Sequence, residues 1–188
     1  MSTSTSTSTT TTPARSDNRI RHAPETLREG LPPAGAALLA ATALVWPALA
    51  GRRWGPHRMA TGIWYRLLRK PGFQPPDKVI PVAWTVIDCA LTVAGYRLLR
   101  QPSTAPRNRA LGLWTLNVGL IGGWSGLFFG RRNLPASTAL AAGMIGSGIA
   151  YVAQASTVDR PAASAGVPFV LWVGFATALT AALWRKNA

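Results

Sequence analysis

Cysteine, histidine and acidic residues are scarce in this sequence of 188 residues, which contains one cysteine, two histidines and six acidic residues. A single cysteine, Cys89, excludes a disulfide framework within the chain. His22 and His57 have no other histidine or cysteine close to them in the sequence, so neither a metal-ligand cluster nor a Cys/His nucleophile pair can be assembled. Because the acidic residues are also scattered, no pair of carboxylates is available for hydrolysis. We therefore predict no catalytic residue and no metal site.

The shortage of acid leaves a formal net charge of +14, with 20 Lys and Arg residues. In a soluble protein such a charge would favour nucleic acid as a partner. Here the arginines fall between long apolar runs, as expected of residues that flank membrane spans and meet anionic headgroups. We therefore expect a lipid bilayer, and no nucleic acid, as the partner. Slightly more cations lie on the side that holds residues 51–78 and the C-terminus, which favours that side as cytoplasmic.

Long apolar runs are what the sequence has in abundance. Four runs carry no charge, and a fifth, Val79–Tyr96, contains only Asp88. At about 1.5 Å per residue, a helix of roughly twenty residues crosses the ~30 Å hydrocarbon core of a bilayer. We predict an all-α integral membrane bundle of five transmembrane helices over residues 31–188, in a multi-pass protein of a bacterial cell membrane. The expected spans are about 33–50, 79–99, 111–129, 136–156 and 166–184.

Residues 1–30 form a Ser/Thr- and Arg-rich segment without core-forming residues. This composition predicts a disordered tail. A Ser- and Arg-rich start also resembles an organellar transit peptide, although Asp17, Glu25 and Glu29 weaken that interpretation.

Prolines set the expected boundaries around the first loop and at two span ends. Pro71, Pro75 and Pro76 cannot lie inside a regular helix, so residues 64–84 should begin as a shaped, semi-rigid loop. Arg69 and Lys70 would hold this loop at the level of the lipid headgroups. By the same logic we expect Pro47 close to the end of the first span and Pro168 in the first turn of the fifth.

Glycines four residues apart mark the third and fourth spans, for example Gly122 with Gly126, and Gly143 with Ser147. Small residues at this spacing share one helix face and let another helix approach closely. Two interpretations follow. The glycines pack the helices of one chain against each other, or they form the face of a homodimer.

Asp88 lies near the middle of the second expected span, where a carboxylate is costly and is a functional candidate by default. The alternative is a neutral acid that only specifies packing through a hydrogen bond to a neighbour such as Asn117, Gln154 or Thr177.

Three blocks of sequence resemble a known family. The first is W-Y-x-x-L-x-K-P-x-x-x-P-P at Trp64–Pro76, followed by A-W-T at Ala83–Thr85. The second is W-S-G-L-F-F-G at Trp124–Gly130, and the third is P-F-V-L-W-V-G-F-A-T-A-L at Pro168–Leu179. Together they are similar to the TspO/translocator protein family, the tryptophan-rich sensory proteins.

The resemblance implies that the bundle encloses an aromatic site for a planar hydrophobic ligand, most simply a tetrapyrrole such as porphyrin or haem, which the protein binds, transports or senses. Indole faces suit a planar macrocycle. By this resemblance Trp84 and Trp172 line the pocket and the proline-containing loop covers its mouth. The expected ligand-binding residues are Trp84, Trp172, Tyr65, Phe73, Pro75, Pro76, Asp88 and Trp124.

The sequence departs from the family pattern at four positions. Asp88 stands where the family has tyrosine, Gly126 where it has proline, and Ile121 and Thr180 where it has asparagine. A pocket lined by Ile121 offers no amide to a ligand. Two alternatives to ligand binding remain: a porphyrin-degrading enzyme driven by light and oxygen, and a ligand-free structural or regulatory membrane subunit. The sterol-type pattern is absent from the last helix, so sterol binding is not expected.

Overall fold

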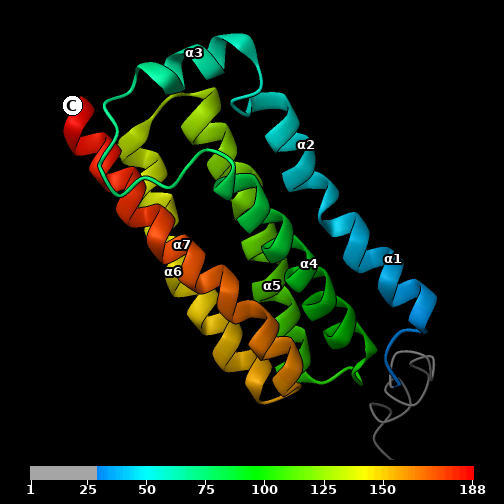
Figure 1. Cartoon of the computed structure of the whole chain (residues 1–188). Coiled ribbons are helices and arrows are strands. Elements are labelled where there is room, and N and C mark those ends of the chain that lie inside the picture. Colours follow the sequence, from blue (N-terminus) through cyan, green and yellow to red (C-terminus); the bar gives the residue numbers. More distant parts are fainter. Residues whose placement is uncertain (1–28) are drawn as a thin grey trace, which may run out of the picture.

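The computed structural model describes residues 29–188, so the predictions for residues 1–28, including those for the tail and His22, lie outside the described residues. Every regular element in the described part is helical. The elements are α1 (Pro33–Ala43), α2 (Val45–Trp54), α3 (Met59–Leu67), α4 (Val79–Arg100), α5 (Ala105–Ser125), the π-helix η2 (Gly126–Gly130), α6 (Leu134–Ser156) and α7 (Arg160–Asn187). Figure 1 shows them as one elongated bundle, with α3 lying across one end.

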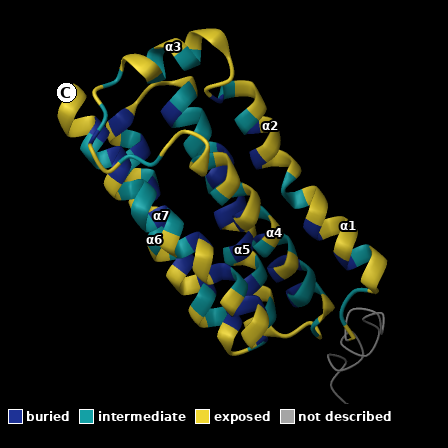
Figure 2. Ribbon diagram, viewed as in Figure 1, coloured by how far each residue is buried: buried dark blue, intermediate teal, exposed yellow. Residues whose placement is uncertain are grey.

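Five helical stretches are long and apolar enough to cross a membrane: Pro33–Trp54, Val79–Arg100, Ala105–Gly130, Leu134–Ser156 and Arg160–Asn187. This confirms the predicted all-α bundle of five spanning helices. Large apolar side chains point outward, among them Leu38, Val82 and Leu171, each more than 60% exposed. Exposed residues also lie along the length of the helices in Figure 2. An apolar surface of this extent is stable only against lipid or another apolar surface.

Packing between the helices forms a closed ring. The order around the ring is α4, α7, α6 and α5, and the first span closes it with α1 against α4 and α2 against α5. A central cluster includes Leu91, Trp114, Tyr151 and Phe169, all nearly inaccessible to solvent. Two side-chain hydrogen bonds cross between helices inside this cluster: Trp114 Nε1 donates to Leu91 O at 2.9 Å, and the Tyr151 hydroxyl donates to Ala162 O at 2.9 Å.

Two proline predictions are wrong. Pro47 does not end the first span but lies in the first turn of α2, which continues to Trp54. The chain breaks one turn earlier, at Leu44, because a helical Pro47 would clash with the carbonyl four residues before it. Pro168 lies inside α7, because Asp159 caps this helix earlier than expected and Pro161 occupies its first turn.

The predicted loop before the second span is partly helical. α3 includes Trp64 and Tyr65, which were expected in a loop. No proline falls between Pro56 and Pro71, so nothing prevents one short helix there. From Leu68 to Lys78 the chain is irregular, as the prolines predicted.

Glycines allow close contacts within the chain. The Cβ of any larger residue at Gly95 would collide with the Trp114 ring, and one at Gly122 would collide with the Trp46 indole. A Cβ at Gly126 would lie 3.4 Å from the Trp54 ring. This supports the packing interpretation for one face of the third span. Gly119 on the third span, and Gly143 and Gly146 on the fourth, are open instead, since a Cβ at any of them would meet nothing within 4 Å.

An ion pair joins the helices at the end opposite α3. Arg97 on α4 donates from Nε to Asp159 Oδ1 at 2.9 Å and from its second guanidinium nitrogen to Oδ2 at 3.1 Å. Gln101 donates to the same carboxylate, which also accepts the backbone N–H of Ala162 at 2.7 Å. The bonds from Arg97 outweigh the opposing effect of burial and hold the pKa of Asp159 below its ordinary value.

We predict that Gly95→Ala destabilises the bundle by about 1–3 kcal/mol, the usual range for overpacking. Trp114 is buried and hydrogen-bonded, so it cannot move aside without losing its contacts. Thermal unfolding in detergent measures the effect. Gly112→Ala on the same helix as Trp114 is the control, because a Cβ there meets nothing within 4 Å. Equal melting temperatures for the two variants would contradict the prediction.

We also predict that Asp159→Asn lowers the free energy of unfolding by about 1–2 kcal/mol at pH 7. This is the contribution of a charge-assisted hydrogen bond, reduced because the Arg97 side chain is 40% exposed to solvent. The folded-state pKa of Asp159 is depressed, so its contribution is present above the unfolded carboxyl pKa of about 3.9 and is lost progressively as pH falls through the lower folded-state pKa. The difference in melting temperature between wild type and variant should therefore shrink as the pH is lowered from 7 to 3. Asp77→Asn, at an exposed carboxylate, serves as the control.

Candidate functional site

An aromatic cluster occupies the end of the bundle that carries α3. Trp124 stacks on Phe128 with ring centroids 4.8 Å apart and meets Phe129 edge to face at 6.0 Å. From α3, Trp64 contacts Phe128 at 5.6 Å and Tyr65 contacts Phe129 at 5.9 Å. The π-helix positions these rings, because its extra residue per turn changes which side chains face inward and leaves Phe128 only 2% exposed.

A second aromatic chain joins the irregular loop to α7. Trp172 lies 5.4 Å from Phe175, and Phe175 lies 6.3 Å from Phe73 in the loop. Phe73 is 53% exposed, so its ring covers Phe175 from outside. The structure therefore places the predicted residues Phe73 and Trp172 in one connected group.

Four buried polar atoms have no hydrogen-bond partner within the described residues. They are Trp124 Nε1, Trp172 Nε1, Asp88 Oδ1 and Gln74 Oε1. Trp124 lies near the end of α5 and Gln74 in the loop, whereas Asp88 and Trp172 lie near the middle of α4 and α7. Both Trp124 and Trp172 pack against the central cluster. A buried polar group without a partner is costly, and native proteins rarely leave one. Two indole donors and two oxygen atoms thus remain for a guest that carries its own polar groups.

Trp84 and Asp88 lie four residues apart and share one face of α4. Both are half-buried, and Trp84 packs against the central cluster that also receives Trp124 and Trp172. Trp84 forms no ring-to-ring pair among residues 29–188, so a direct Trp84–Trp172 contact is not part of the arrangement.

The packing alternative for Asp88 named three hydrogen-bond partners, and each is engaged elsewhere. Asn117 donates to Leu113 O and accepts from Ser147 at 2.7 Å, Gln154 donates to Thr157, and Thr177 donates to Val173 O. That version of the packing interpretation is therefore wrong.

The loop is fixed to the C-terminal end of α7 by one amide. Asn187 Oδ1 accepts the backbone N–H of Arg69 at 2.9 Å, and its Nδ2 donates to the carbonyl of Arg69 at 3.1 Å. The predicted loop residues Pro75 and Pro76 lie half-buried and exposed, respectively. The carbonyl of Pro76 accepts the first N–H of α4, from Val79, at 2.8 Å.

Lys70 interacts with two groups beside the aromatic cluster. Its ammonium lies 4.5 Å from the centroid of the Tyr65 ring and 3.9 Å from Asp77. Burial first, and then the charge of Asp77, raise the pKa of the Tyr65 hydroxyl above its ordinary value. The hydroxyl is therefore protonated at neutral pH and can donate a hydrogen bond.

Sequence reasoning missed Phe128, Phe129, Phe175 and Gln74. The first three stand inside the quoted motif blocks, which was an available signal. The sequence contains no comparable signal for Gln74, because the burial of its side chain depends on how the loop folds over the bundle.

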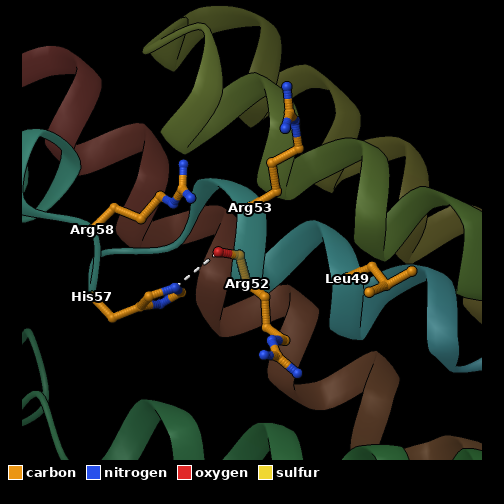
Figure 3. A pocket seen from close by; sticks show the side chains of 5 residues that line it. All are labelled: Leu49, Arg52, Arg53, His57 and Arg58. Carbon is orange, nitrogen blue, oxygen red and sulfur yellow. Dashed lines mark hydrogen bonds between the residues drawn. The ribbon is translucent and has the colours of Figure 1, made fainter.

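Two open pockets lie next to this region, where α2 turns into α3. One has a volume of about 730 Å³ and is lined by Leu49, Arg52, Arg53, His57 and Arg58, as shown in Figure 3. The other, of about 500 Å³, shares Arg53 and Arg58 with it and extends to Phe129 and Arg132. Neither is lined by Trp84 or Trp172, and neither pocket was predicted from the sequence.

Comparison with known proteins agrees with this architecture. The model of the TspO/MBR family matches residues 36–185. The chain is 29% identical to protein CrtK of Rhodobacter capsulatus over 136 residues, covering 67% of this chain and 79% of CrtK.

Two further relatives have the names expected from the motif blocks. The translocator protein of Homo sapiens is 30% identical over 128 residues, covering 66% of this chain and 75% of that protein. The tryptophan-rich sensory protein of Cereibacter sphaeroides is 28% identical over 130 residues, covering 66% and 77%. Because the family model spans nearly the whole helical bundle, this chain belongs to the TspO/MBR family and is a multi-pass integral membrane protein.

Proposed function

We propose that this protein binds a planar hydrophobic tetrapyrrole, a porphyrin or haem, at the α3 end of the bundle and transports or senses it in a bacterial cell membrane. The observation that carries the proposal is the set of unpartnered buried polar atoms on Trp124, Trp172, Asp88 and Gln74 beside two aromatic chains. Aromatic faces stack on a macrocycle, while pyrrole nitrogens and propionates offer partners to indole N–H and carboxyl groups.

The loop supplies the entrance to this site. Lys70 and the backbone of Arg69 lie at its start, and Phe73, Pro75 and Pro76 follow. Lys70 can pair with a propionate by exchanging its weak contact with Asp77, since an exposed ion pair at 3.9 Å contributes little. The loop therefore acts as a cover that is anchored at Asn187 and Phe175.

Homodimerisation through the open glycine faces is part of the same proposal. Gly119, Gly143 and Gly146 leave room for a second helix to approach.

Trp172→Ala and Trp84→Ala are each expected to weaken protoporphyrin binding about three- to tenfold, the loss of one aromatic contact. Quenching of tryptophan fluorescence during titration of the purified protein measures the affinity. Trp184→Ala is the control, because Trp184 is exposed near the end of α7. If both variants titrate as wild type does, the ligand site lies elsewhere.

Asn187→Ala is expected to release the loop and to accelerate protoporphyrin entry, while changing the melting temperature little. The amide holds both backbone groups of Arg69, and an exposed hydrogen bond contributes only about 0.5–1.5 kcal/mol. Stopped-flow quenching gives the association rate, and hydrogen exchange reports on residues 68–78. Asn108→Ala, at the opposite end of the bundle, is the matched control. An unchanged association rate together with faster exchange would show that the loop does not gate entry.

A further inference from the structure

We propose that the pocket between α2, α3 and the turn after η2 is a binding site for an anionic phospholipid, whose phosphate lies between Arg53 and Arg58. This site is separate from the tetrapyrrole site and does not depend on it. Both pockets described above share Arg53 and Arg58 as lining residues. In Figure 3 the side chains of Arg53 and Arg58 extend to the same side of the turn, whereas that of Arg52 extends to the other.

The charge at this pocket is uncompensated within the described residues. Residues 29–188 contain four acidic residues, Glu29, Asp77, Asp88 and Asp159. The two salt bridges formed among these residues use Lys70 and Arg97, and neither involves an arginine of the pocket. Arg53, Arg58 and Arg132 line one pocket of about 500 Å³ without a carboxylate among its lining residues. Like charges gathered in this way repel each other, so a bound anion stabilises the arrangement. Guanidinium groups fit phosphate oxygens in a bidentate manner.

The turn that forms the pocket is built and held in place. His57 Nε2 is 2.9 Å from the carbonyl of Arg52, and Gly55 N–H donates to Gly51 O at 2.8 Å. From the far wall, Arg132 donates to Ala60 O at 3.4 Å and lies 5.7 Å from the centroid of the Trp64 ring. Arg132 has a φ of 54°, in the left-handed region that glycine and asparagine adopt more easily than arginine. The chain therefore keeps an arginine at a position where glycine would be less strained.

Apolar walls distinguish a lipid from a free anion. Trp54, Met59 and Phe129 line the same pocket as the arginines, and the Met59 side chain is 83% exposed. Along α2, Val45 and Leu49 are also about half exposed and continue this apolar surface into the membrane span. A phosphate site at the end of a span, next to an apolar surface, fits the headgroup and acyl chains of a phospholipid. Inorganic phosphate would make no contact with the apolar side chains of the pocket.

The site lies next to the aromatic cluster. Phe129 lines this pocket and also contacts Tyr65 and Trp124. No arginine of the pocket is among the residues proposed for the tetrapyrrole, so each site can be altered by itself.

Titration of delipidated full-length protein in a neutral detergent tests the proposal, with the melting temperature as the readout of binding. Dioleoyl-phosphatidylglycerol should stabilise the protein at lower concentrations than dioleoyl-phosphatidylcholine, which has the same chains and a neutral headgroup. Arg53→Gln and Arg58→Gln should each reduce the apparent phosphatidylglycerol affinity about fivefold, and the double variant about 25-fold. Protoporphyrin quenching by the double variant should equal that of wild type.

The matched control is the double variant Arg185→Gln with Lys186→Gln, which removes two exposed cations at the same end of the bundle. An equal loss of affinity in this control would show that diffuse surface charge causes the effect, and it would contradict a specific site. Equal affinity for phosphatidylcholine would contradict the requirement for an anionic headgroup. Full stabilisation by inorganic phosphate would contradict the assignment of a lipid as the ligand. If the double glutamine variant cannot be purified, Arg58→Lys keeps the charge but loses bidentate geometry, and it should still bind phosphatidylglycerol more weakly than wild type.

Discussion

The exclusion of water from the surface of the five spans is the constraint on which the rest of the structure depends. In hydrocarbon every backbone N–H and C=O must be paired inside the protein, and an apolar segment of about twenty residues achieves this as a helix. Lipid removes the hydrophobic drive for helices to associate, so close packing must hold them together. The contacts of Gly95 with Trp114 and of Gly122 with Trp46 provide that packing. Apolar side chains such as Leu38 and Leu171 are correspondingly placed outside.

The two ends of the bundle differ in how completely their polar groups are paired. At one end Asp159 accepts bonds from Arg97, Gln101 and a backbone N–H, which fixes α4 to the start of α7. Toward the other end, Trp124 Nε1 has no hydrogen-bond partner among residues 29–188, and neither has Trp172 Nε1 near the middle of α7. The end that holds Asp159 is therefore tightly tied together, whereas the rest of the bundle keeps unmet hydrogen-bonding capacity beside aromatic surfaces.

The same open end carries a concentration of positive charge that the ion pairs of residues 29–188 do not neutralise. Arginines near a span end attract anionic headgroups. What is specific here is a pocket that combines Arg53 and Arg58 with apolar walls. Phe129 belongs both to that wall and to the aromatic cluster. The pocket and the aromatic cluster therefore border each other at this one side chain.

The sequence by itself determined the five helices, because uncharged runs of sufficient length have one stable form in lipid, and it determined the family, because the blocks from Trp64, Trp124 and Pro168 keep their order. It did not determine the break at Leu44, the interior position of Pro168 or the helix α3, since each depends on local caps and carbonyl contacts that periodicity does not reveal. Only the tertiary structure decided that Asp88 Oδ1 has no hydrogen-bond partner among residues 29–188, that Asn187 holds the loop and that Arg53 and Arg58 share a pocket with Arg132. These relations join residues distant in the chain, and the packing of the helices alone sets which of them meet.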